Sequence, residues 1–152
     1  MSGQGAELAR MLFLYGTLMK HVARGYPARL VACLGDGQTA TVRGALYAVR
    51  DGRVAYPALV ARGLTRVKGV LYPLPEAAEW LARLDRFENY DPRRPNGGEY
   101  VRRVLDVRLA SGDVVRAKAY VYRRPLQPGM QRIAHGDFAR YLAETGLKPY
   151  AR

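Results

Sequence analysis

Alternating apolar and polar positions predict several β-strands in the first half of the chain. The first strand is expected over residues 11–16, which begin with the apolar run MLFL. Residues 41–47 and 66–72 share a basic, Gly, apolar, Leu, Tyr sequence with strand-like alternation. Residues 54–60 lie between them, and Pro57 predicts an edge or bulged strand there because proline cannot donate a ladder hydrogen bond.

In the second half the periodicity becomes helical over residues 75–89, where Pro75 suits the first turn of a helix. A polar segment rich in proline and glycine, residues 89–98, is the longest expected loop. Two strands over residues 100–110 and 114–123 are expected to form a hairpin, and helices are expected over residues 21–34 and after Asp137, which would cap the latter. We therefore predict an α+β fold, a small and mostly antiparallel sheet curled into a β-barrel with helices outside.

The length of 152 residues fits a single domain, with residues 1–9 as a loose tail. The single cysteine, Cys33, has no partner for an intrachain disulfide and is expected to be a small buried thiol. No apolar segment approaches the roughly 20 residues that a membrane span needs, and the start of the chain lacks an export signal. These features predict a reduced, cytoplasmic protein.

The formal net charge of +12 raises the question of nucleic-acid binding, since basic proteins gain affinity by releasing counterions from phosphates. The 25 basic residues are mostly arginines spread along the whole chain, which a general preference for arginine would also produce. Nucleic acid is therefore an unlikely partner, although the pairs Arg93-Arg94, Arg102-Arg103 and Arg123-Arg124 would matter if they converged in space.

The turn Tyr15-Gly16-Thr17-Leu18 is a candidate binding site because it follows directly on the first strand. Glycine permits backbone angles that bring successive N–H groups close to a ligand, and Thr17 adds a hydroxyl donor. Such a turn suits a small carboxylate or carbonyl group. The alternative is an ordinary buried strand followed by a turn.

Reactive residues are scarce, so several chemistries are excluded. Ser2 and Ser111 do not lie in a nucleophile elbow, and neither His21 nor His135 has metal-ligand spacing to the other or to Cys33. Phosphate-loop and dinucleotide-binding glycine patterns are also missing. The remaining candidates are carboxylates, tyrosines and backbone donors.

One carboxylate falls on the apolar face of the helix expected near residues 77–88. At about 100° per residue, Glu88 projects about 20° from Leu81, inside the apolar arc, with Asp85 at the edge of that arc. Apolar surroundings and a like-charged neighbour raise the pKa of a glutamate, as a general base requires. Alternatively the helix frays by Phe87 and Glu88 reaches solvent. For Asp85 we favour a role as acceptor for a backbone N–H or an arginine over direct catalysis.

These segments together resemble the gamma-glutamyl cyclotransferases, in particular the small group that includes gamma-glutamylamine cyclotransferase and AIG2-like proteins. The resemblance spans nearly the whole chain and depends most on the combination of Tyr-Gly-Thr-Leu at residues 15–18 with Leu-Asp-x-x-Glu at residues 84–88. It also includes the segments at residues 42–47, 56–59, 67–72, 100–103, 119–122 and 133–137.

The resemblance implies a β-barrel with a pocket for a small-molecule γ-glutamyl substrate, which is cyclised to 5-oxoproline without a cofactor or metal. It places Glu88 at the general base and the turn of Tyr15, Gly16, Thr17 and Leu18 at the substrate cradle. Tyr56, Tyr100 and Tyr120 are candidate pocket walls, and residues 89–98, longer than in compact relatives, are either a lid or a surface excursion. A non-catalytic binding protein of the same fold is the alternative. The sequence does not predict the oligomeric state.

Overall fold

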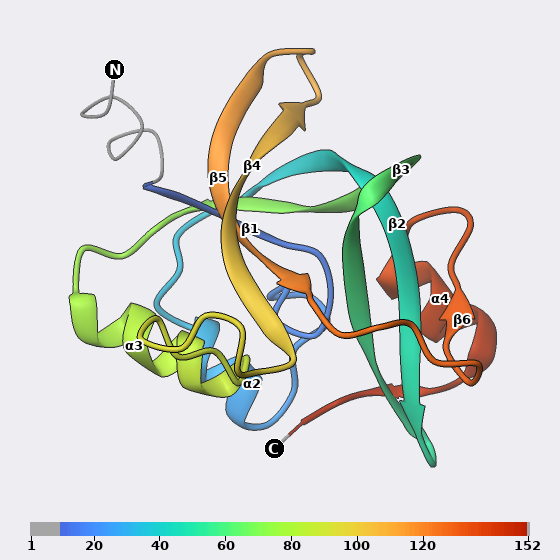
Figure 1. The fold of residues 1–152 in the computed structure, drawn as a ribbon. Helices are drawn as coiled ribbons and strands as arrows, with labels where there is room; N and C mark the ends of the chain where they lie inside the picture. The colour runs from blue at the N-terminus through green and yellow to red at the C-terminus, as the bar shows by residue number, and fades with distance from the viewer. Residues whose placement is uncertain (1–9, 152) are drawn as a thin grey trace.

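The computed structural model describes residues 10–151, so the tail expected over residues 1–9 lies outside the described residues. Three helices and seven strands follow one another along this part of the chain (Figure 1). In chain order they are β1 (Met11–Leu14), α2 (Tyr26–Val31), β2 (Gln38–Asp51), β3 (Val54–Pro73), α3 (Ala78–Phe87), β4 (Tyr100–Leu109), β5 (Val114–Tyr122), β6 (Gln131–Arg132), α4 (Phe138–Thr145) and β7 (Lys148–Pro149).

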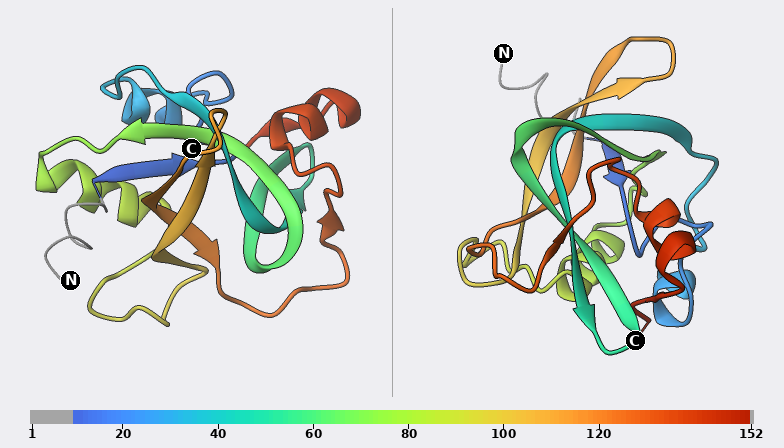
Figure 2. Two further views of the ribbon diagram at one scale, coloured as in Figure 1. Left: turned by 90° about the horizontal axis from the view of Figure 1, so that it is seen from above. Right: turned by 90° about the vertical axis from the view of Figure 1, so that its right-hand side faces the viewer.

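The sheet closes on itself as a five-stranded barrel, as predicted. Its strands follow the order β2-β4-β5-β1-β3, and a further pairing of β2 with β3 completes the ring (Figures 1 and 2). All of these pairings are antiparallel except that of β1 with β5, and the short strands β6 and β7 extend the sheet beside β2 and β3. The predicted α+β barrel with outer helices is therefore confirmed.

The strands expected over residues 54–60 and 66–72 are one continuous strand, β3, which pairs with β2 along almost its whole length. The register shifts at Gly44 and Ala45, which pair with Thr65 and Val60, so four residues of β3 are left over as a bulge. Within this bulge Gly63 has a φ of 119°, which other residues rarely adopt. The expected bulge therefore exists, but it lies after Val60 and not at Pro57.

The core combines the inner faces of the barrel strands with the apolar sides of α3 and α4. Phe13 and Phe138 are completely buried, and α3 buries Trp80 and Leu84. The cap predicted for the last helix is present, since the Asp137 side chain accepts a hydrogen bond of 3.1 Å from the backbone N–H of Arg140.

Two predictions in the segment between β1 and β2 are wrong. The helix expected over residues 21–34 is only the six residues of α2, because Gly25 has a left-handed φ of 62° and Pro27, which has no N–H, suits only a first helical turn. Cys33 follows this short helix and is exposed, not buried. Within residues 10–151 no helix is long and apolar enough to cross a membrane.

Candidate active site

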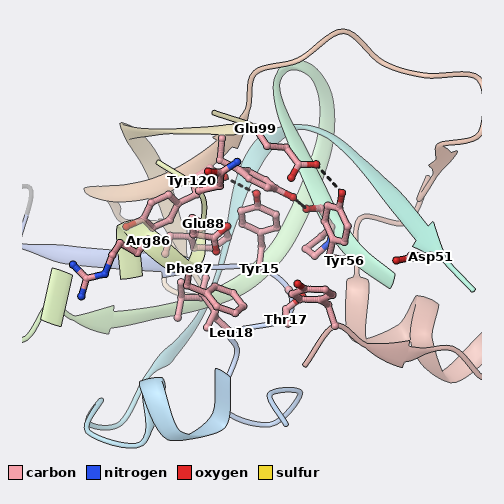
Figure 3. A pocket seen from close by; sticks show the side chains of 17 residues that line it. Tyr15, Thr17, Leu18, Asp51, Tyr56, Arg86, Phe87, Glu88, Glu99 and Tyr120 are labelled. Atoms are coloured by element: carbon pink, nitrogen blue, oxygen red, sulfur yellow. Dashed lines mark hydrogen bonds between the residues drawn. The ribbon is translucent and has the colours of Figure 1, made fainter. Parts of the chain in front are cut away.

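A cavity of about 530 Å³ lies at one end of the barrel. The turn of residues 15–18, the start of β4, the early part of β3 and the end of α3 all contribute to its wall (Figure 3). Segments that are distant in the sequence therefore meet here, including the two that carry the main candidate residues.

The turn after β1 is held against β3 by a close approach that only glycine permits. A Cβ atom built on Gly16 would lie 2.0 Å from Cγ of Pro57. Gly16 does not have the positive φ that the sequence argument assumed. Glycine is needed at this position because a larger side chain would clash with Pro57, and not because of the backbone conformation. The turn is closed by a hydrogen bond of 3.0 Å from the Met19 N–H to the Gly16 carbonyl.

The turn carries polar groups that the protein leaves without partners. The Thr17 hydroxyl is buried, yet among the described residues it has no hydrogen-bond partner. Likewise, within residues 10–151 no group accepts a hydrogen bond from the backbone N–H of Gly16, Thr17 or Leu18. Since buried polar groups are nearly always hydrogen-bonded, an unpaired hydroxyl on a cavity wall indicates a position where a ligand atom completes the bonding.

Glu88 lies directly after the last residue of α3, as its C-terminal cap. The helix does end at Phe87, but the side chain of Glu88 is half-buried and points into the cavity toward Tyr15 (Figure 3). The alternative that it reaches bulk solvent is therefore wrong. Burial, followed by the charges of Glu99 and Asp85, raises the pKa of Glu88 from 4.5 to about 8.

A second glutamate in the cavity, Glu99, escaped the sequence analysis. Its carboxylate accepts a hydrogen bond of 2.7 Å from the Tyr56 hydroxyl, and both residues line the cavity. Burial and the neighbouring Glu99 raise the pKa of the Tyr56 hydroxyl above its ordinary value. Glu99 lies at the end of the polar loop, where no periodicity indicated its direction. Its position immediately before the pocket residue Tyr100 was the available signal.

Asp85 has the accepting role that we favoured from the sequence. Arg102 from β4 approaches both carboxylate oxygens at 2.6 Å, and the Tyr120 hydroxyl donates to Oδ1 at 2.6 Å. Asp85 is buried, whereas Arg102 is partly exposed and lies over the ring of Tyr90. These bonds connect α3 to β4 and β5. They thereby fix the position of the end of α3, from which Glu88 points into the cavity.

The tyrosines expected as pocket walls, Tyr56, Tyr100 and Tyr120, do line the cavity, and Tyr100 together with Tyr15 of the turn also anchors it. Tyr100 donates a hydrogen bond of 2.5 Å to the Pro57 carbonyl, and Tyr15 donates one of 2.5 Å to the Tyr120 carbonyl. Burial raises the pKa of both hydroxyls well above the ordinary value, so they remain neutral donors. The walls are thus fixed by bonds between three strands and the turn.

The loop of residues 89–98 folds back on itself beside the cavity. Asn89, which lines the cavity, has a positive φ of 55°, and a Cβ atom on Gly98 would lie 1.8 Å from the Asn89 carbonyl oxygen. The two ends of the loop therefore touch. Within residues 10–151 no three histidine, cysteine or carboxylate side chains are grouped as metal ligands.

Residues 12–140 match the family described as gamma-glutamyl cyclotransferase, AIG2-like. The match covers most of the chain, which therefore belongs to this family, as the resemblance predicted. No curated protein sequence matches the chain significantly.

Solved structures with a similar fold share little sequence with the chain. An AIG2-like protein from Mus musculus has a TM-score of 0.66 at 22% identity, over 94% of this chain and 96% of the mouse protein. YkqA from Bacillus subtilis has a TM-score of 0.64 at 21% identity, over 90% of this chain but only 42% of YkqA. A gamma-glutamyl cyclotransferase has a TM-score of 0.53 at 15% identity, over 74% of this chain and 65% of that enzyme. At these identities the similarities establish the fold alone.

Proposed function

We propose that the protein is a cofactor-independent gamma-glutamyl cyclotransferase. In the proposed reaction the α-amine of a γ-glutamyl compound attacks its own side-chain carbonyl carbon. A C–N bond forms within the five-membered ring of 5-oxoproline, and the C–N bond to the attached amine or amino acid breaks. Membership of the family and the arrangement of the cavity support this proposal.

The reaction needs no nucleophile from the protein, because both reacting groups belong to one substrate molecule. Holding a flexible chain in the attacking conformation is by itself worth several orders of magnitude in rate. We assign this role to the turn of residues 15–18, whose unpaired N–H groups and Thr17 hydroxyl would bind the carboxylate or the carbonyl of the substrate. The same donors would stabilise the negative charge that develops on the carbonyl oxygen.

What the protein must supply is a base for the attacking amine, and we assign Glu88 to that role. An α-ammonium group has a pKa of about 8, whereas an ordinary glutamate titrates near 4.3, about four pH units lower. A Glu88 pKa of about 8 removes most of that difference. The proton that Glu88 takes from the ammonium would then be delivered to the departing nitrogen, which balances the reaction.

The observation that carries this proposal is the placement of a raised-pKa carboxylate and an unpaired hydroxyl, Glu88 and Thr17, on the wall of one cavity. A binding protein for a small acid would need the donors of the turn. Such a binding protein would gain nothing from Glu88, whose carboxylate lies near those of Glu99 and Asp85, because a negatively charged Glu88 would repel an acidic ligand.

The proposal is tested with a panel of γ-glutamyl amino acids and γ-glutamyl amines, with 5-oxoproline and the released amine both quantified. We expect equal amounts of the two products, and no product from the same compounds with an acetylated α-amine, because that nitrogen can no longer attack. Release of glutamate instead of 5-oxoproline would indicate hydrolysis and contradict the proposal.

The role of Glu88 is tested with Glu88→Gln, which keeps the size of the side chain and removes the base. We expect turnover to fall by a factor of about 10² to 10⁴, the usual contribution of a general base, while 5-oxoproline still binds. Glu79→Gln, the same change on the exposed side of α3, is the control and should leave turnover unchanged. Normal turnover in Glu88→Gln would exclude Glu88 as the base. Binding without turnover of any compound in the wild type would favour the non-catalytic alternative.

A further inference from the structure

A second region with unusual charge lies on the outer surface of β2, β3 and β4. Four cationic side chains gather there, and we call them the cationic face: Arg43, Arg66, Lys68 and Arg108. All four are exposed, and their neighbours on the inner side of the same strands, Val42, Val67 and Val107, are buried. The alternation along each strand therefore directs the four cations outward together.

The strand register makes these cations neighbours on the sheet. Arg43 of β2 is the cross-strand partner of Arg66 of β3, and Thr41 lies between Lys68 of β3 and Arg108 of β4. Like charges directly opposite one another on a sheet are destabilising. The repulsion between Arg43 and Arg66 is therefore reduced when an anion lies between the two guanidinium groups, as it is by water and salt.

The cationic face is not neutralised by the protein itself. None of its four members forms an ion pair with any acid in the part of the chain that the structure describes. Of the two acids on the neighbouring hairpin, Asp106 faces Arg116 at 3.9 Å, and Asp113 accepts a hydrogen bond of 3.1 Å from the Ser111 hydroxyl. Arg132 adds a fifth cation at the edge, where it donates to the Thr65 hydroxyl at 3.0 Å.

Three of these cations border a hollow of about 480 Å³. Arg66, Lys68 and Arg108 line it with the hydroxyl-bearing residues Thr39 and Thr41, and its floor is made of small residues and Leu109. With strands about 4.8 Å apart, the row from Lys68 to Arg108 spans about 10 Å, and residues two apart along a strand add about 7 Å. Such a surface is larger than one phosphate group.

The cationic face and the proposed active site do not overlap. β4 begins at the cavity with Tyr100 and reaches the cationic face eight positions later at Arg108, and β3 likewise runs from Tyr56 to Lys68 (Figure 1). The two regions have no lining residue in common. An anion at the cationic face therefore serves a purpose other than holding the γ-glutamyl substrate.

We infer that the cationic face binds the phosphate backbone of double-stranded nucleic acid without reading its sequence. Arginine supplies most of the cations, and its planar fork matches phosphate oxygens in pairs. The lining of the hollow includes no aromatic ring on which an unpaired base would stack. Leu109 is the only large apolar residue that lines the hollow, whereas the core of a protein–protein interface usually gathers several large apolar or aromatic side chains. A duplex, whose bases are already stacked inside it, fits a surface of this composition.

The test measures fluorescence anisotropy of a labelled 20-base-pair duplex of mixed sequence with the full chain at 50 and 200 mM NaCl. If the cationic face neutralises about four phosphates, affinity should fall by about 10² between these salt concentrations. Arg66→Glu combined with Lys68→Glu should reduce affinity at 50 mM NaCl at least tenfold and flatten the salt dependence.

Arg93→Glu combined with Arg94→Glu is the matched control, because it makes the same charge change on the exposed loop of residues 89–98. It should bind like the wild type. Equal losses in both double variants would mean that only net charge matters and would overturn the inference. So would a flat salt response, or unlabelled polyphosphate that displaces the duplex better than unlabelled duplex does at equal phosphate concentration.

Arg43→Gln keeps the test informative if the double variant fails to fold. Because this change removes one of two facing like charges, we expect the folded state to be as stable as the wild type or slightly more so. Duplex affinity at 50 mM NaCl should nevertheless fall several-fold. Unchanged affinity would contradict a role for the cationic face. These outcomes are independent of whether 5-oxoproline is formed.

Discussion

The cavity and the cationic face stand at opposite ends of the same strands, and they treat charge in opposite ways. The lining of the cavity includes two partly buried carboxylates, Glu88 and Glu99, with the exposed Asp51 at its rim and one arginine, Arg86. The cationic face collects arginines and a lysine on an open surface. In a protein with only 13 acidic residues and a net charge of +12, such a gathering of acids in one cavity is unexpected by composition alone.

The comparison shows how burial changes the effect of like charges. In the cavity, burial and then the charges of Glu99 and Asp85 raise the pKa of Glu88 to about 8, so repulsion between carboxylates is relieved by proton uptake. On the open surface, arginines cannot release their protons near neutral pH, so repulsion there is relieved by water, salt or a bound anion. Burial of like charges thus favours proton uptake, and for the open cationic face we propose anion binding.

The largest effect that we expect concerns the dependence of stability on pH. Glu88 titrates near 8 in the folded protein and near 4.5 in the unfolded chain. Between these values the folded state keeps a proton that the unfolded state has lost, so the free energy of unfolding falls as the pH rises. Glutamine at position 88 does not titrate. The free energy of unfolding of Glu88→Gln should therefore rise relative to that of the wild type by about 2 to 5 kcal/mol between pH 4.5 and 9, at about 1.4 kcal/mol per pH unit.

This gain is measured by urea unfolding of both proteins across that pH range. Glu79→Gln again serves as the control, since its exposed carboxylate should leave the curve parallel to that of the wild type. A parallel curve for Glu88→Gln as well would mean that the cavity does not hold the carboxylate protonated.

The next largest effect should come from the ion pair behind the cavity. Asp85→Asn leaves Arg102 without its counter-charge, and breaking a buried pair typically costs about 3 to 5 kcal/mol. Because Arg102 is partly exposed, we expect a loss of about 2 to 4 kcal/mol in the free energy of unfolding. Asp106→Asn breaks the open pair with Arg116 and should cost less than about 1 kcal/mol. Equal losses of stability in Asp85→Asn and Asp106→Asn would contradict the expectation that a buried ion pair contributes more than an exposed one.

A smaller effect is expected at Thr17, whose hydroxyl is unpaired within the described residues. Thr17→Val should not lower the free energy of unfolding, because no hydrogen bond within the protein is lost. It should weaken 5-oxoproline binding about tenfold, which calorimetry can measure. Thr145→Val is the converse control, since that hydroxyl donates to the Tyr141 carbonyl at 2.8 Å. It should lower stability by about 1 kcal/mol and leave binding unchanged.

The smallest effect that we expect is a shift in the pH profile caused by Glu99. The charge of Glu99 is one of the causes that raise the pKa of Glu88, but burial is the larger one. Glu99→Gln should therefore move the rise of kcat/KM toward lower pH by no more than about one unit. Glu76→Gln, an exposed change, should leave the profile in place. A shift toward higher pH would contradict the assigned electrostatics.

The barrel was predictable because each strand and turn carried a local signal. The alternation in β2 to β5 and the Asp137 cap are properties of a few neighbouring residues, and they were confirmed. The single long strand β3 was not predicted, because its continuity depends on pairing with β2 across a bulge. The sequence offered a conformational reason for Gly16, whereas the structure gives a steric one that only the folded protein creates, when it brings Pro57 against Gly16.

The candidate site was predictable only in part, for the same reason. The helical angle of Glu88 relative to Leu81 is a local property, so its inward direction could be predicted. Glu99 and the gathering of Arg43, Arg66 and Arg108 depend on strand register, which no single segment specifies. Of the arginines in the three pairs noted in the sequence, Arg102 is held by Asp85.

The four surplus residues of β3, 61–64, separate the part of the strand that lines the cavity from the part that carries Arg66 and Lys68. One of them, Leu64, leaves 82% of its surface to water. Because these residues have no partner in the ladder, the chain can be lengthened there without moving the register on either side. A short peptide tag or a fluorophore attached at this point would report on either end of the barrel while disturbing neither.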